Sequence, residues 1–245
     1  MKSTRFDYAL LVAGFLAFWQ LLHWAVGPDV VSSPCATIAR AVALLGTPAF
    51  WGHVNATLTA FALASVISVV GGIAIGLWLG LRRFAGDVAD PILGTLYSIP
   101  KITLYPIILL MFGLGVSAKI AFGVIHGIFP IAIFTMNAVR NVAPVFRRTA
   151  RVMRLSPAAT AATIMAPAAL PEILAGIRVG VALTLLGTLI GELFAATSGL
   201  GFVLIRAMDV HAVVDILAIT LLLFCFAACV NASLRLVERW ARHGG

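Results

Sequence analysis

The residues best suited to binding a partner lie in one basic segment, between Arg147 and Pro171. Arg147, Arg151 and Arg154 stand four and three residues apart, so a helix would bring them onto one face. Guanidinium groups in a row bind carboxylates or phosphates. The segment is therefore predicted to dock, either on the anionic headgroups of a lipid surface or in a groove on a soluble partner.

The same segment carries the signals of two short helices. Ser156 and Pro157 form a good helix start, because serine caps a helix and proline favours its first position. We expect a short helix from Ala158 to Met165, closed by the two prolines that follow it. A bend is predicted near Arg154, between this helix and the one before it.

A few polar residues lie inside apolar stretches and are candidates for lining a solute pathway. The carboxylate of Glu192 must face a protein partner or a watery cavity, because a charge facing lipid is costly. A structural hydrogen bond or a helix-end role is the alternative for Glu192. Lys101 is a candidate for lining the pathway or for reaching the membrane surface, and Thr188 for lining the pathway or for a bond between helices.

The motifs of an enzyme are absent from the sequence. None of the three lysines, Lys2, Lys101 and Lys119, follows the glycine frame of a phosphate-binding loop. No Ser/His/Asp order, zinc-binding helix or ligand-like Cys/His spacing occurs either. We therefore expect no catalytic residue, cofactor or metal, and any work driven by a nucleotide must be fuelled by another subunit.

The elements that carry these residues are predicted to be membrane-spanning helices. Of 245 residues 62% are hydrophobic and 11% charged, and the mean hydropathy is +1.08. A soluble domain has about 25% charged residues, and a helix needs roughly 20 apolar residues to cross a bilayer. The sequence predicts an all-α, polytopic membrane protein with a single domain over residues 1–245. About six spans are expected, at residues 8–26, 56–81, 91–113, 118–139, 173–197 and 212–236.

Positive charge is distributed unevenly between the two sides that these spans imply. With the N-terminus inside, the inner side receives twelve basic residues and the outer side three, Arg40, Lys119 and Arg206. The positive-inside rule then predicts that both termini and the basic segment face the cytoplasm. Basic residues flank the spans without interleaved aromatics, so nucleic acid is not an expected partner.

Small residues and prolines indicate how the spans pack. One predicted span has a small residue at every fourth position, a spacing that lets helix backbones approach closely. This stripe, expected to pack within the chain, consists of Ala64, Ser68, Gly72, Gly76 and Gly80. The third and fourth predicted spans are expected to be broken by prolines, at Pro91, Pro100, Pro106 and Pro130.

The order of the spans and the basic insert resemble the inner-membrane permease subunit of bacterial ABC importers, of the nitrate, taurine and aliphatic-sulfonate type. The hallmark of that family is a cytoplasmic Glu-Ala-Ala-x-x-x-Gly loop followed by Ile-x-x-Pro. Here Arg148-Thr149-Ala150 stands at the first part, Arg154 at the glycine, and Ile164 to Pro167 at the end. Further matches extend over nearly the whole chain: Ser33-Pro34, Tyr97 to Lys101, Pro106 to Gly113, Pro167 to Pro171, and Glu192 with Ser198 to Gly201.

The resemblance implies a coupling segment, residues 142–171, that docks on separate ABC ATPase subunits. Its expected coupling residues are Arg148, Ala150, Arg151, Arg154, Ser156, Ala158, Ala159 and Ala162. Arginine in place of the family's glutamate and glycine predicts a more basic docking surface, which indicates either an acidic complement on the partner or a degenerate subunit. The resemblance also implies the bacterial inner membrane, a homodimer with a second permease copy around the pathway, and a periplasmic or lipid-anchored solute-binding protein.

The rival class is a secondary transporter or channel that works without an ATPase. Such a protein needs ion-coupling residues within its spans, where this chain has little beyond Glu192 and scattered hydroxyl groups. It also leaves the basic insert without a role. The sequence does not identify the solute. The net positive charge is no evidence for an anionic solute, because the arginines are expected on the inner side of the membrane.

Overall fold

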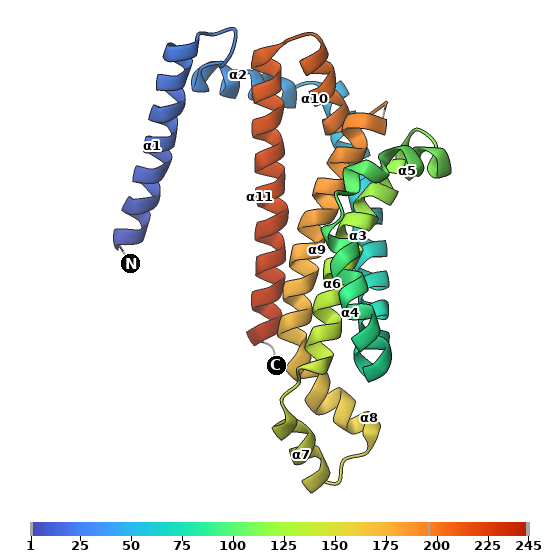
Figure 1. Cartoon of the computed structure of the whole chain (residues 1–245). Coiled ribbons are helices and arrows are strands. Elements are labelled where there is room, and N and C mark those ends of the chain that lie inside the picture. Colours follow the sequence, from blue (N-terminus) through green and yellow to red (C-terminus); the bar gives the residue numbers. More distant parts are fainter. Residues whose placement is uncertain (1, 196, 244–245) are drawn as a thin grey trace. The chain divides into compact units, whose positions relative to one another are not determined.

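Helices make up the whole architecture. The structure, a computed structural model, describes the backbone of residues 2–195 and 197–243, and in these helices it does not describe the side chains at positions 2–6, 8–9, 147, 151, 157–158, 195, 237 and 239–243. Within this part of the chain every regular element is helical, which confirms the predicted all-α class. The elements (Figure 1) are α1 (Lys2–Val26), α2 (Pro34–Leu45), α3 (Pro48–Leu81), α4 (Arg83–Ser98), η1 (Lys101–Leu104), α5 (Tyr105–Phe112), α6 (Val116–Arg140), α7 (Pro144–Val152), α8 (Pro157–Thr160), η2 (Ala161–Met165), α9 (Ala166–Ala195), α10 (Leu200–Asp209) and α11 (Val213–His243).

Several of these helices are long and apolar enough to cross a membrane. Four such stretches are found among the described residues, Pro48–Leu81, Val116–Arg140, Ala161–Phe194 and Val213–Leu236. The count rises to five if α4 and the helices after it form one span, which is bent by 85°. Leu10–Val26 is a shorter apolar helix. The membrane-spanning class is confirmed, and the total of six spans stays a prediction.

The prolines act differently from one another. Pro100 coincides with a real break, because the residue before a proline avoids the helical region and Ile99 is extended at φ −61° and ψ 133°. Pro106 sits in the first turn of α5, where its missing N–H costs nothing. Pro91 and Pro130 lie inside α4 and α6, so the prediction that they break their helices is wrong.

The chain folds into two compact units, each built from two sequence segments: residues 1–56 with 198–226, and residues 57–197 with 227–245. In the first unit Arg40 of α2 forms an ion pair with Asp215 of α11. The hydrogen bond that Arg40 donates to this carboxylate, together with the negative charge of Asp215, raises the pKa of Arg40. His53 accepts a hydrogen bond at Nδ1 from the backbone N–H of Gly199, 3.1 Å away, just before α10.

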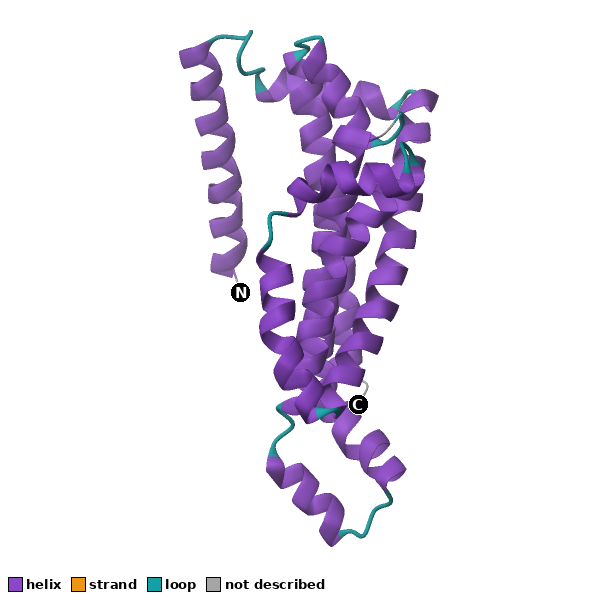
Figure 2. Cartoon of the chain, turned by 45° about the vertical axis from the view of Figure 1, so that its right-hand side comes forward, coloured by secondary structure: helices purple, strands orange, loops and turns teal. Residues whose placement is uncertain are grey.

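The core of the second unit is formed by α3, α6 and α9 (Figures 1 and 2). The small-residue stripe of α3 faces α6 so closely that a Cβ added to Gly72 would lie 2.7 Å from Cβ of Ile131. α6 also contacts α9 closely, because a Cβ at Gly191 would lie 2.9 Å from Cα of Lys119. Backbones approach this closely only where side chains are missing. The predicted role of the stripe, packing within the chain, is confirmed.

Candidate functional site

The hairpin of α7 and α8 projects beyond the ends of α6 and α9 (Figure 2). Its first helix carries apolar side chains on the outside, at Val145, Phe146 and Val152, with Met153 directly after it. These side chains are between 44% and 83% exposed, and their spacing places them on one helical face. Apolar side chains gathered on an exposed face mark an interaction surface.

The bend that ends α7 has the geometry of a glycine turn without a glycine. Arg154 adopts a left-handed backbone conformation, with φ of 50°. The N–H of Leu155 donates to the carbonyl of Ala150 at 3.1 Å, which closes the helix end in the way that a left-handed residue permits. The chain therefore makes the bend that was predicted near Arg154, although arginine stands where the resemblance expects glycine.

The next helix begins as predicted. The Ser156 side chain accepts a hydrogen bond from the N–H of Ala159 at 3.2 Å, and α8 starts at Pro157. The prediction that Pro167 and Pro171 close this helix is wrong. A wide π turn, η2, follows α8 and leads directly into α9, which contains both prolines. Such a wide turn offsets the carbonyl groups that the Pro167 ring would otherwise strike.

The candidate coupling residues differ in how much of each is exposed. Arg148, Arg154, Ser156 and Ala162 are exposed, Ala159 is half-buried and Ala150 is buried. The side chains of Arg151 and Ala158 lie outside the described residues. The exposed arginines and the apolar face of α7 therefore belong to one projecting hairpin.

Glu192 has a protein partner inside the bundle. Its Oε1 lies 3.4 Å from Nζ of Lys119, and the two side chains are 0% and 1% exposed. The Thr57 hydroxyl lies 2.9 Å from each carboxylate oxygen. The charge distribution predicted Lys119 on the outer side of the membrane, outside the spans. This prediction is wrong, because Lys119 is buried in the first turn of α6. No local pattern signals this pair, which joins residues 73 positions apart.

Thr188 lies one helical turn before Glu192. With Thr184 these residues form a row of buried polar side chains on α9, the buried polar seam. The Thr188 hydroxyl donates to the carbonyl of Thr184 at 2.9 Å, and the Thr184 hydroxyl donates to the carbonyl of Gly180 at 2.9 Å. Both threonines are fully buried. They face Gly123 and Gly127 of α6, where an added Cβ would collide with their side chains. These hydroxyl groups therefore satisfy their hydrogen bonds within α9 while allowing close packing.

Lys101 lies at a different place, beside the break between α4 and α5. Its Nζ donates to the carbonyl of Tyr97 at 2.8 Å. The same atom lies 5.0 Å from the ring centroid of Tyr97 and 5.9 Å from that of Phe129, close enough for cation–π attraction. The lysine is half-buried, so part of it reaches the surface of the protomer.

The sequence of this helical chain matches a known protein family. Residues 68–243 match the model of the binding-protein-dependent transport system inner membrane component. The chain belongs to this family. Its members are permease subunits of ABC importers, in which ATP hydrolysis takes place in a separate subunit. The family does not favour a secondary transporter or channel.

Curated relatives support the assignment to this permease family, and a solved structure has a similar fold. The chain is 29% identical over 240 residues to the taurine transport system permease protein TauC of Escherichia coli (strain K12), covering 94% of this chain and 87% of the relative. It is 30% identical over 203 residues to the nitrate import permease protein NrtB of Synechocystis sp. (strain ATCC 27184 / PCC 6803 / Kazusa), covering 79% and 74%. The fold is similar to a chain of the inward-facing MetNI methionine ABC transporter, with a TM-score of 0.65, 18% identity, and coverage of 76% and 93%.

Proposed function

We propose that the coupling segment, residues 142–171, docks on an ABC ATPase subunit and transmits its motion to the solute pathway. The observation that carries the proposal is the unbroken helical run from Pro157 through η2 to the end of α9. No loop interrupts this run, so displacement of the hairpin would be passed directly to the start of α9. Thr188 and Glu192 lie in α9, and their packing against α6 would change with it.

The chemistry of the hairpin favours a protein partner over lipid alone. Arg148 and Arg154 are exposed and would pair with carboxylates of an acidic groove. The apolar side chains of α7, such as Val152, would be covered in the same groove. Contact with anionic headgroups is the competing role for these arginines, and membrane lipid is a second partner in the proposal.

The remaining features of the assembly are proposed from the family, the charge asymmetry and the buried polar seam. Both termini and the coupling segment face the cytoplasm, and a solute-binding protein delivers its cargo on the outer side. Two copies of the chain, as a homodimer, enclose the pathway between them, and the whole of residues 1–245 acts as one transmembrane domain. Glu192 and Thr188 act on the pathway by holding α9 against α6, and Lys101 is the pathway candidate with access to the protomer surface.

The docking proposal is tested at Ala162, which is exposed in η2. We expect Ala162→Glu to abolish uptake and to reduce the ATPase that co-purifies with the permease, while membrane insertion stays normal. Ala162→Ser is the matched control, because it adds a polar atom with little bulk and should retain uptake. The half-buried Ala159 is tested in the same way, with Ala159→Glu as the disruptive variant and Ala159→Ser as its control. Normal uptake and normal complex yield in Ala162→Glu and Ala159→Glu would favour the lipid-contact role of the segment.

A further inference from the structure

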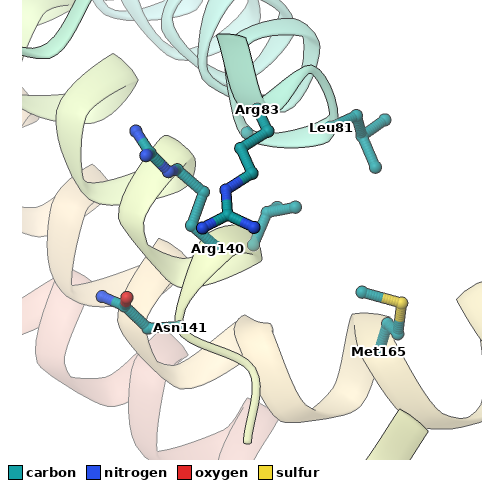
Figure 3. A pocket seen from close by; sticks show the side chains of 7 residues that line it. Leu81, Arg83, Arg140, Asn141 and Met165 are labelled. Carbon is teal, nitrogen blue, oxygen red and sulfur yellow. The ribbon is translucent and has the colours of Figure 1, made fainter. Parts of the chain in front are cut away.

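A cavity of about 650 Å³ opens where α3 ends, α4 begins and α6 ends, with η2 as a further wall (Figure 3). Its volume lies within the range of ligand pockets. The described residues that line it include two arginines and no acidic residue: Gly80, Leu81, Arg83, Val139, Arg140, Asn141 and Met165. Figure 3 shows Arg83 reaching from the start of α4 toward the end of α6, with Met165 on the facing wall.

Arg140 is held in position by its surroundings. It forms an ion pair with Asp87 of α4. A Cβ added to Gly86 would lie 3.0 Å from Nη1 of Arg140, so the missing side chain at Gly86 leaves room for the guanidinium group. Only about a quarter of the Arg140 side chain is exposed, 24%. Arg140 is thus fixed in the wall of the cavity, between α4 and α6.

Arg83 provides a second positive charge at the cavity. Among the described residues it makes no ion pair and no side-chain hydrogen bond, whereas Arg140 already shares Asp87. The Arg140 guanidinium, which is paired with Asp87, turns away from Leu81 and Met165, whereas Arg83 reaches into the space between them (Figure 3). An anion bound by Arg83 would supply a counter-charge and accept charge-assisted hydrogen bonds.

The cavity lies at the ends of two helices that are long and apolar enough to cross a membrane, because Leu81 and Arg140 are their last residues. Trp78 is exposed one turn earlier on α3, and Arg82 lies over its ring, 5.6 Å from the centroid. Tryptophan and arginine at a helix end are typical of the membrane–water interface.

We propose that this cavity binds a phosphate group, supplied by an anionic phospholipid of the adjoining leaflet. Arg83 holds the phosphate through charge-assisted hydrogen bonds. The exposed side chains of Leu81 and Phe84, 71% and 84% exposed, offer apolar surface beside the cavity for the acyl chains. Because Met165 belongs to η2, the bound lipid would contact the coupling segment itself.

The test compares two neighbouring arginines in the complete transporter, with its ATPase subunits. Purified, delipidated complex is titrated with phosphatidylglycerol or phosphatidylcholine, and bound lipid is counted by native mass spectrometry. We expect the parental complex to prefer phosphatidylglycerol and Arg83→Gln to bind it about five-fold more weakly, the effect of one basic residue near a membrane surface. Arg82→Gln removes the same charge one position away and should bind nearly as the parent does. Arg83→Lys should retain part of the affinity, because lysine keeps the positive charge but lacks the paired N–H donors of the guanidinium group.

A competition arm identifies the source of the phosphate. Inorganic phosphate should fail to displace phosphatidylglycerol at comparable concentration if acyl chains contribute to binding. Displacement that depends on Arg83 would support the phosphate site with a free anion as its ligand. Equal losses in Arg82→Gln and Arg83→Gln would overturn the site in favour of diffuse surface charge. Equal binding of both lipids by the parent would also overturn it, as would loss of ATPase from Arg83→Gln without any change in lipid or phosphate binding.

Discussion

Lys119 of α6 and Glu192 of α9 form an ion pair that is closed off from solvent inside the second unit, with 3.4 Å between Nζ and Oε1. Thr57 of α3 adds its hydroxyl to the carboxylate, so the three core helices meet at one charged point. Removal of one partner from such a buried pair costs about 3–5 kcal/mol, whereas replacement of both by apolar residues is often neutral or stabilising. The pair therefore ties the helices together in a way that depends on both residues.

This relationship predicts strongly non-additive effects. Glu192→Gln retains an acceptor for Thr57 and should fold, but with a lower unfolding temperature and lower uptake, because Lys119 loses its counter-charge. Glu192→Leu should be destabilised by about 3–5 kcal/mol. The double variant Lys119→Met with Glu192→Leu should recover most of that stability. Thermal unfolding of the purified complex and solute uptake measure these effects; additive losses in the double variant would show that the two residues act independently.

The close approach of α3 and α6 gives a second prediction. A Cβ at Gly76 would lie 2.5 Å from Cβ of Thr135 and 2.6 Å from the carbonyl of Ala132, so the helices must separate in Gly76→Ala. Overpacking of this kind costs roughly 1–3 kcal/mol. Gly94 is the matched control, because a Cβ there meets no atom within 4 Å and alanine is the better helix former. Gly94→Ala should be neutral or stabilising, and equal unfolding temperatures for the two variants would contradict the packing.

Membrane orientation is tested by cysteine labelling in intact cells. The three native cysteines, Cys35, Cys225 and Cys229, are exposed and must first be replaced by serine. Arg148→Cys should then escape a membrane-impermeant reagent added from outside, and Arg206→Cys should react with it, because the charge asymmetry places these positions on opposite sides. Reaction of both in permeabilised cells is the control. Strong labelling at position 148 in intact cells would reverse the proposed topology.

Local signals made the coupling hairpin predictable. Ser156 caps the N–H of Ala159 three residues away, and the bend at Arg154 needs only its own backbone and neighbouring hydrogen bonds. Such interactions are encoded within one or two helical turns, so they can be recognised in a single sequence. The composition was equally sufficient for the all-α membrane class, because long apolar stretches have few other stable forms.

Long-range register accounts for what could not be predicted. Whether Lys119 meets lipid, solvent or Glu192 depends on how α6 and α9 are aligned along their length, and this alignment is decided by glycine contacts such as Gly191 against Lys119.

Proline gave an ambiguous local signal. Pro100 ends a helix, whereas Pro167 follows a π turn and continues one. The effect of a proline depends on whether the preceding turn can widen.

The left-handed conformation of Arg154 predicts that glycine would stabilise the hairpin. A left-handed backbone costs a residue with a side chain roughly 1–2 kcal/mol, and φ at Arg154 is 50°. Glycine has no such cost, so Arg154→Gly should make the 142–171 segment more resistant to limited proteolysis in the purified complex. Arg154→Ala is the control for charge, because it removes the guanidinium group and keeps the Cβ.

The resistance of the parent, Arg154→Gly and Arg154→Ala to proteolysis separates the effect of backbone strain from that of charge. If backbone strain dominates, Arg154→Gly is the most resistant, and Arg154→Ala behaves like the parent. If repulsion among the arginines dominates, glycine and alanine protect the segment equally. ATPase activity of the complex gives an independent measurement: loss of activity in both variants would assign the Arg154 side chain to the docking contact. Retained activity in both would leave the bend, and not the charge, as the feature that this position supplies.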